Sequence, residues 1–191
     1  AVREWPEGLA LFDPCGVLSG LDDLRDAAAR LTGAPAAGTR AVIAATFSEA
    51  VLSYLRAGGA VLLLQTGDAP LPAVSGPFWW HAVHLLEDHP LMNRFPHQGF
   101  ADMQFYGIAT PWALDTGRLA EVLPDVREIR PLMRRLHPSQ YTLSDTLFEA
   151  RIGEGRLLAT TLRFQGGLGD QPSGLRDQVA GRWLLRALLD W

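Results

Sequence analysis

The chain has no lysine, so all 17 of its basic residues are arginine. These arginines are scattered along the sequence, and the formal net charge is -4. Phosphate binding depends on a concentrated basic surface, so we expect no nucleic-acid partner. No apolar run approaches the ~20 residues of a membrane-spanning helix, so a membrane is not expected as a partner either.

The chain has a single cysteine, Cys15, which excludes an internal disulfide and an all-cysteine metal site. A nucleophilic cysteine needs a histidine base beside it, and all the histidines lie far away in the sequence. Pro14-Cys15-Gly16 is also not a recognisable nucleophile elbow. We therefore interpret Cys15 as a turn or buried residue. The cysteine content does not define the compartment, for which we favour the cytoplasm.

The usual catalytic signatures are missing as well. The stretch from Leu11 to Leu18 is similar to the nucleophile motif of haloacid dehalogenase phosphatases, but Cys15 replaces the second aspartate and no lysine is present to hold the phosphoryl group. We predict instead that Asp13 binds backbone amides in a turn. No Gly-x-Ser-x-Gly elbow occurs, and the glycines of residues 166–169 do not match a dinucleotide fingerprint. No cofactor is expected.

Apolar runs in the first third of the chain predict an α/β fold. They cover residues 9–12, 41–45 and 60–64, without polar alternation, and helical patterns lie between them. Continuous apolar strands separated by helices are typical of a parallel sheet covered on both faces. At 191 residues the chain has the size of one domain. We therefore predict a single three-layer α/β domain over residues 1–191.

The spacing of polar residues predicts where the helices begin. Ser19 with Asp22, and Thr46 with Glu49, have the spacing of capping boxes. The three prolines of residues 69–77 predict an irregular loop. Further along we expect the following elements: a strand ending at 109–112, a helical turn at 119–123, an extended piece at 126–133, a β-hairpin over 148–164, and a final helix capped by Ser173 whose buried stripe includes Val179 and Trp183.

Residues 78–106 form an aromatic block that contains four of the five histidines. His81 and His84 could bind one metal ion only on a helix, and their neighbours are apolar, so we interpret these histidines as packed or capping residues. The aromatic rings have two readings. They can pack in the core or at an interface, or they can form a platform for a sugar whose hydroxyls bind polar side chains. The candidate sugar-binding residues are Trp79, Trp80, His97, Asp102 and Gln104.

Within this block, the residues from His89-Pro90 to Phe95-Pro96-His97, followed by Asp102-Met103-Gln104, resemble a signature of one glycoside hydrolase group. It belongs to the C-terminal domain of bacterial family-two glycoside hydrolases, the β-galactosidase-like enzymes. Residues 13–14, 59–64 and 148–158 agree with the same resemblance. Met103 and Phe105 occupy positions where that signature has tryptophans. The resemblance implies a class I glutamine amidotransferase-like fold, of the flavodoxin kind, with a mostly parallel sheet flanked by helices and a C-terminal β-hairpin and helix.

The resemblance also implies a non-catalytic domain, excised from the C-terminal part of a longer glycoside hydrolase. Glycosidase chemistry needs two carboxylates about 5 Å apart for retention, and in that family they lie in a separate barrel. The implied partners are the catalytic domains of the parent enzyme, a carbohydrate and a second copy of the chain. Two alternatives stay open, which are a degenerate amidotransferase-like hydrolase and a pure oligomerisation module.

Three polar residues at the ends of predicted strands are additional ligand candidates. Ligands of open α/β sheets bind beyond the carboxyl ends of the strands, where Asp13, Gln65 and Asp68 are expected. Amidotransferases have a cysteine after a central strand, whereas the turn here is Gln65-Thr66-Gly67-Asp68. This part of the prediction rests on analogy between folds.

Overall fold

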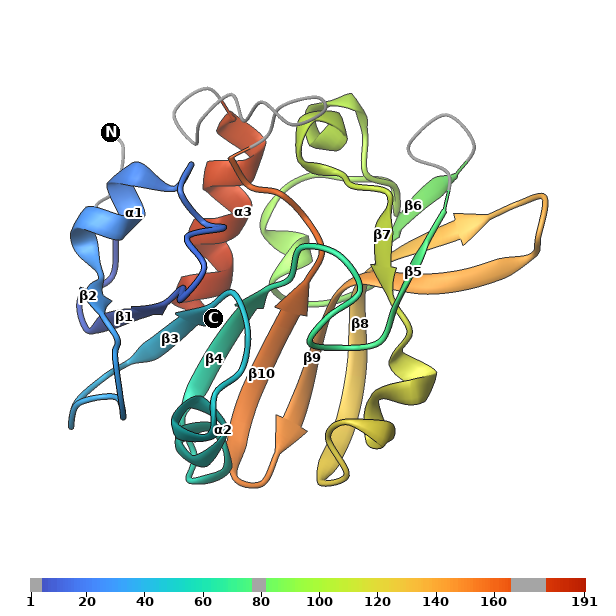
Figure 1. Cartoon of the computed structure of the whole chain (residues 1–191). Helices are drawn as coiled ribbons and strands as arrows, with labels where there is room; N and C mark the ends of the chain where they lie inside the picture. Colours follow the sequence, from blue (N-terminus) through green and yellow to red (C-terminus); the bar gives the residue numbers. More distant parts are fainter. Residues whose placement is uncertain (1–4, 77–81, 166–177) are drawn as a thin grey trace.

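The computed structural model describes residues 5–76, 82–165 and 178–191. One half of its sheet is parallel, with the strand order β2-β1-β3-β4-β10 (Figure 1). These strands are β1 (Leu9–Phe12), β2 (Ala29–Arg30), β3 (Ala41–Ala44), β4 (Ala60–Leu64) and β10 (Gly155–Thr160). The predicted apolar runs are thus the central strands, which supports the prediction that both faces of this half are covered.

The other half of the sheet is antiparallel. It comprises β5 (Ala73–Ser75), β6 (Val83–Leu86), β7 (Trp112–Leu114), β8 (Val126–His137) and β9 (Thr142–Ile152). β10 pairs with β9, which also pairs with β7 and β8, and β8 pairs with β6. β8 and β9 form a long ribbon that projects from the body of the molecule (Figure 1). The predicted hairpin over 148–164 is therefore part of a larger antiparallel system.

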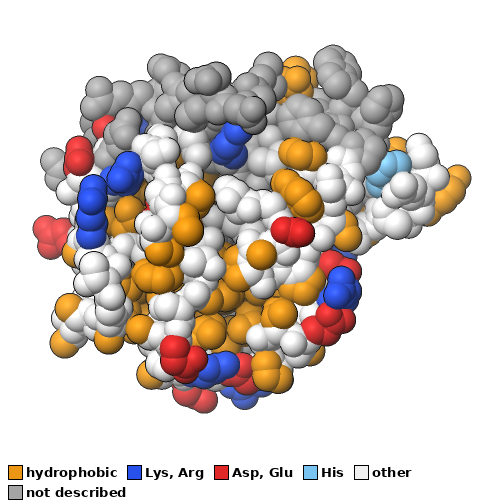
Figure 2. Space-filling view, viewed as in Figure 1, with side chains coloured by type: hydrophobic (Ala, Val, Ile, Leu, Met, Phe, Trp, Pro, Cys, Tyr) orange, Lys and Arg blue, Asp and Glu red, His pale blue; other side chains and the backbone are white. Residues whose placement is uncertain are grey.

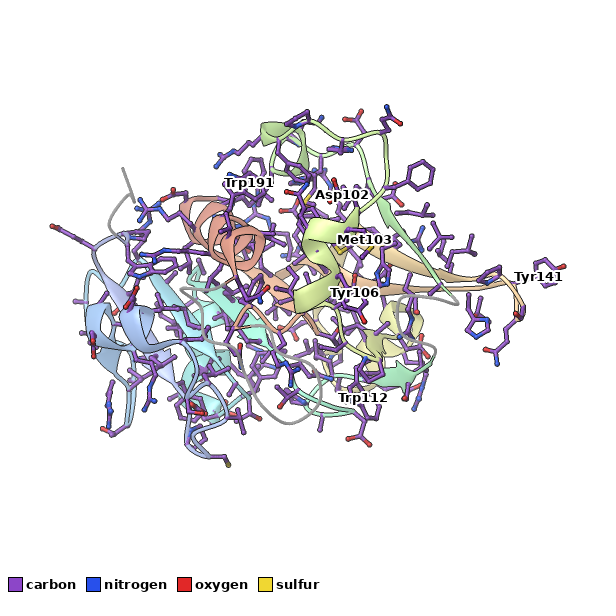
Figure 3. The ribbon with its side chains drawn as sticks, turned by 90° about the horizontal axis from the view of Figure 1, so that it is seen from above. Asp102, Met103, Tyr106, Trp112, Tyr141 and Trp191 are labelled. Carbon is purple, nitrogen blue, oxygen red and sulfur yellow. The ribbon has the colours of Figure 1, made fainter. Side chains whose placement is uncertain are left out.

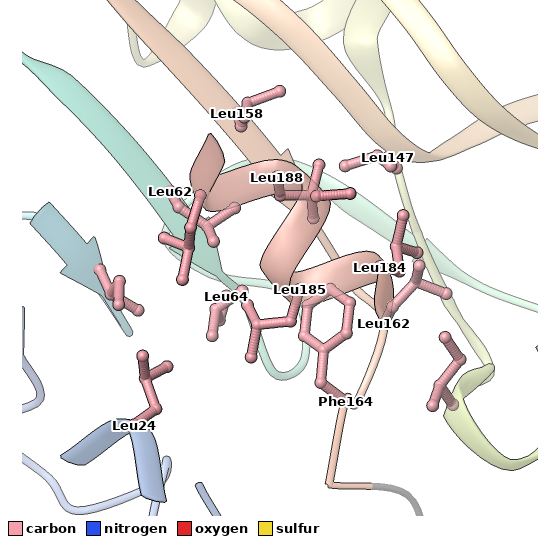
Figure 4. Packing of buried hydrophobic residues seen from close by; sticks show 14 of the residues in the cluster. Leu24, Leu62, Leu64, Leu147, Leu158, Leu162, Phe164, Leu184, Leu185 and Leu188 are labelled. Carbon is pink, nitrogen blue, oxygen red and sulfur yellow. The ribbon is translucent and has the colours of Figure 1, made fainter. Parts of the chain in front are cut away.

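Helices cover both faces of the sheet. α3 (Val179–Asp190) packs on one face, where Leu184, Leu185 and Leu188 share a buried cluster with Leu62 and Leu158 (Figure 4). α2 (Glu49–Arg56) packs on the other face, where Val51 and Leu55 join side chains of β3, β4, β9 and β10. α1 (Asp22–Ala27) adds Leu24 to the α3 face. The three-layer α/β fold is confirmed, and the predicted packing of the final helix on the sheet is confirmed with it.

Two of the predicted helix starts are wrong. α1 begins after Leu21, which makes no side-chain cap bond, so Ser19 is not its N-cap. α2 is capped by Ser48, whose hydroxyl accepts the backbone N–H of Val51 at 3.3 Å, rather than by Thr46. Ser48 has the extended backbone of an N-cap residue, and both predicted boxes place the cap two residues too early. Thr46 and Ser48 are both residue types that cap helices, and the spacing to Glu49 alone does not show which of them caps α2.

Two other predictions need correction. Residues 73–75 are a strand, because Ala73 and Ser75 pair with the edge of β7 in spite of the neighbouring prolines. Val179 is 80% exposed at the start of α3, so it is not part of the buried stripe. Ser173 lies outside the described residues. On the face shown in Figure 2, hydrophobic side chains spread over the middle, and charged side chains lie mainly around the rim.

Candidate functional site

Gln65 follows the central strand β4 and is only 1% exposed. Its side-chain nitrogen donates to the carbonyl oxygens of Gly67 at 3.0 Å and Leu71 at 2.8 Å, and its side-chain oxygen accepts the N–H of Leu71 at 2.9 Å. Its backbone N–H donates to Thr160 of the neighbouring strand. The amide therefore holds the loop 65–71 in place, and both of its polar atoms are engaged by the protein itself.

Asp13 lies in the turn after β1, as predicted. Its two carboxylate oxygens accept the N–H groups of Val17 at 3.0 Å and Leu18 at 2.9 Å, so it organises the turn. Cys15 is exposed in the same turn. Asp68 is exposed in the loop that Gln65 holds. Asp13 and Gln65 thus have the structural role of turn organisers, while ligand binding at these strand ends stays a prediction.

His89 connects the aromatic block to the sheet and to α3. It is 6% exposed, and its Nδ1 accepts the N–H of Leu91 at 3.2 Å. Nδ1 therefore carries no proton, and in the neutral ring Nε2 is the N–H that faces the Glu149 carboxylate 3.3 Å away. The indole N–H of Trp191 donates to the other oxygen of Glu149 at 3.0 Å, and the His89 and Trp191 rings meet edge to face.

Sequence reasoning missed Glu149 and Trp191 as members of this network. Glu149 lies on the same face of β9 as Leu147, which is buried against α3, so a charged residue interrupts an apolar face. That interruption was the available signal. Its partner His89 is 60 positions away in the sequence, and no local pattern links the two.

The three polar candidates of the aromatic block bind their own loops. His97 Nδ1 accepts the N–H of Gly99 at 3.0 Å. Asp102 is the N-cap of the 3₁₀ helix η3 (Met103–Ile108), and its carboxylate accepts both the N–H and the side-chain amide of Gln104. The structure brings Asp102 and Gln104 together on an exposed turn. Binding of a sugar by these residues stays a prediction.

Met103 and Phe105, which replace the tryptophans of the glycoside hydrolase signature, have opposite environments. Phe105 is 3% exposed and packs on Phe95, with the ring centroids 5.4 Å apart. Met103 is 63% exposed, and Phe100 is 55% exposed nearby in the chain. Figure 3 shows η3, with Met103 and Tyr106, beside α3. The segment therefore uses one aromatic side chain for the core and leaves two apolar side chains on the surface.

Burial gives His84 an unusually low pKa. It is 4% exposed on β6, and this burial, with the nearby Arg135 guanidinium as a second cause, lowers its pKa to about 4. His84 is therefore neutral at pH 7.

Trp79, Trp80 and His81 lie outside the described residues. Among the residues that the structure describes, no three His, Cys, Asp or Glu side chains are grouped so that they could hold a metal ion.

No helix in the described part of the chain has the length and apolar character needed to cross a bilayer. A model of the family described as "Domain of unknown function (DUF8487)" matches residues 42–191. No curated protein sequence matches the chain.

The chain is similar to several solved structures at low sequence identity. A ThuA-like protein from Parabacteroides merdae is 12% identical with a TM-score of 0.53, and the match covers 97% of this chain and 89% of that one. The cytoplasmic protein STM1381 from Salmonella typhimurium is 9% identical with a TM-score of 0.46, over 80% of this chain and 71% of that one. A cold-adapted β-galactosidase from Rahnella is 11% identical with a TM-score of 0.32, over 75% of this chain and 22% of that one. The ThuA-like structure confirms the expected α/β, glutamine amidotransferase-like fold.

Proposed function

The chain belongs to the family described as "Domain of unknown function (DUF8487)", and from this premise we propose that it is a non-catalytic accessory domain of a β-galactosidase-like glycoside hydrolase. Its proposed role is assembly with the catalytic domains, active-site edging or weak sugar contact. The signature that begins at His89-Pro90 supports the link to glycoside hydrolases, and the glutamine amidotransferase-like fold is consistent with it.

The observation that carries the proposal is the state of Gln65. In the amidotransferases that the fold resembles, a cysteine nucleophile follows a central strand. Here Gln65 stands after β4, buried, with its amide bonded to Gly67 and Leu71. An amide is not a nucleophile, and this one already has protein partners on both polar atoms. This arrangement disfavours the degenerate hydrolase and favours a structural role.

An assembly role is supported by the surface of the aromatic block. The His89–Glu149–Trp191 network attaches this block to β9 and to the end of α3, and Asp102 caps the turn that leads into η3. Met103 is exposed on η3, and Phe100 lies nearby in the chain. Large apolar side chains held on a rigid surface are typical of interface residues.

The test uses the complete gene product. Its hydrolysis of aryl β-glycosides and its mass by light scattering are measured for the wild type and for Met103→Glu. The 63% exposed side chain of Met103 makes few contacts within the domain, so the variant should keep its melting temperature but lose assembly and, with it, activity. Val122→Glu is the control, since Val122 is also an exposed apolar residue, at 46%, but follows the 3₁₀ helix η4 (Thr116–Glu121).

The accessory role is wrong if the gene product hydrolyses no glycoside, or if Met103→Glu behaves like Val122→Glu.

One observation favours the oligomerisation module as a second candidate. Tyr141, at the tip of the β8–β9 ribbon, is 91% exposed, and Leu143 beside it is 43% exposed. In that case the mass of the chain alone should rise with its concentration, and Tyr141→Ser should abolish the rise.

A further inference from the structure

A polar cavity lies where the sheet extends past the end of α3. β8, β9 and β10 continue beyond the last turn of the helix (Figure 1). The cavity has a volume of about 250 Å³, and its lining includes Arg130, Glu149, Arg151, Arg156 and Trp191. Arg156 pairs with Ala60 at the start of β4. The cavity is therefore at the opposite end of the strands from the loop held by Gln65.

Both oxygens of the main carboxylate of the cavity already have hydrogen-bond partners in the protein. One oxygen of Glu149 faces His89 at 3.3 Å, and the other accepts the indole N–H of Trp191 at 3.0 Å. The Arg130 guanidinium is 3.9 Å from the same carboxylate, which is a long contact for an ion pair. Arg151 reaches a backbone carbonyl only at 3.5 Å. Both guanidinium groups therefore keep much of their hydrogen-bonding capacity.

A β-bulge places Arg130 at this cavity. Arg127 pairs with Arg151 and Arg130 with Glu149, so three steps along β8 match two steps along β9. The extra residue lies at Glu128–Ile129, and Glu128 has a φ of +51°, in the left-handed region that side chains rarely adopt. Without the bulge, Ile129 would face Glu149, and Arg130 would point to the other side of the sheet. Bulges of this kind re-aim side chains and often lie beside binding sites.

The charged side chains that line the cavity are unbalanced toward positive. Three arginines, Arg130, Arg151 and Arg156, line it together with two carboxylates, Glu128 and Glu149. Arg156 also donates to the backbone carbonyl oxygen of Trp191. Burial lowers the pKa of Arg156, so its charged form lacks solvent and gains from an anionic partner. A purely structural explanation is that the arginines stabilise the negative C-terminal end of the α3 dipole. It accounts for Arg156 but not for Arg130 and Arg151.

We propose that this cavity binds a small molecule through its carboxylate or phosphate group. Planar guanidinium groups match the geometry of both anions and bind them through paired hydrogen bonds. A volume of about 250 Å³ is below that of most drug-sized pockets, so the ligand is of monosaccharide size, such as a sugar acid or a sugar phosphate. The inference goes beyond the proposed accessory role and does not depend on it.

The test is calorimetric titration of the chain with four probes, which are glucuronate, glucose 6-phosphate, inorganic phosphate and glucose. The wild type should bind at least one anionic probe saturably, with an affinity that falls as salt is added, and should not bind glucose. The double variant Arg130→Gln with Arg151→Gln, and Arg151→Gln alone, should bind that probe roughly 10-fold or more weakly, because each loses a charge-assisted hydrogen bond. Arg118→Gln is the control, since Arg118 pairs with Glu121 on η4.

The probes also separate the two sources of the anion. Preference for glucuronate assigns a carboxylate ligand, and binding of glucose 6-phosphate or inorganic phosphate assigns a phosphate. The proposal is overturned if no anionic probe binds, if glucose binds as well as the anions, or if the double variant binds like the Arg118→Gln control. Because the titration is read on this chain alone, failure of the accessory role in the complete gene product leaves its outcome unaffected.

Discussion

Replacing Gln65 by leucine tests whether this residue is a structural pin or an open site. Leucine has a similar size but no polar atoms, so the change removes the three hydrogen bonds of the side chain to Gly67 and Leu71. Leu71 is 0% exposed, so its N–H and carbonyl groups would be left buried without these partners. At about 1–1.5 kcal/mol for each lost bond, the free energy of unfolding should fall by roughly 3–5 kcal/mol.

The assay is urea denaturation followed by circular dichroism, with the melting temperature as a second readout. A loss of about 3 kcal/mol corresponds to a fall of roughly 6–12 °C for a chain of this size. Thr66→Ala is the matched control at the neighbouring exposed position, and it should change stability by no more than about 0.5 kcal/mol. If Gln65→Leu is as stable as Thr66→Ala, then the amide does not hold the loop, and the structural reading of this strand end is wrong.

Three further predictions concern His84, Trp191 and Gly155. The folded-state pKa of His84, about 4, is below its ordinary value of 6.5, so the contribution of His84 to the free energy of unfolding should be complete above pH 6.5 and fall by up to about 3 kcal/mol toward pH 4. Urea denaturation at both pH values should show that His84→Gln loses this part of the pH dependence. Trp191→Phe removes the donor to Glu149 and should cost about 1.5–3 kcal/mol in the same assay, whereas an unchanged stability would exclude that bond. Gly155→Ala would press a methyl group against a backbone carbonyl of α2 and should lower the melting temperature far more than Gly33→Ala, which has open space; equal melting temperatures would refute the close approach.

The candidate site was predictable only in part. The prediction that Asp13 binds backbone amides is confirmed, because its partners Val17 and Leu18 lie within five residues of it. Glu149 was not assigned a role, since its partners His89 and Trp191 come from distant parts of the chain. A local pattern can predict a turn, but it contains no information about which distant side chain a carboxylate meets.

The sequence by itself determined the α/β fold, the buried strands and the packed C-terminal helix. An uninterrupted apolar run such as residues 60–64 is stable only when both of its faces are buried, and that condition nearly defines a central strand. Only the tertiary structure decided which residue caps α2, what Gln65 does and where Arg130 points. Each of these depends on a backbone conformation or a strand register, and both are set by contacts between segments that are far apart in the chain.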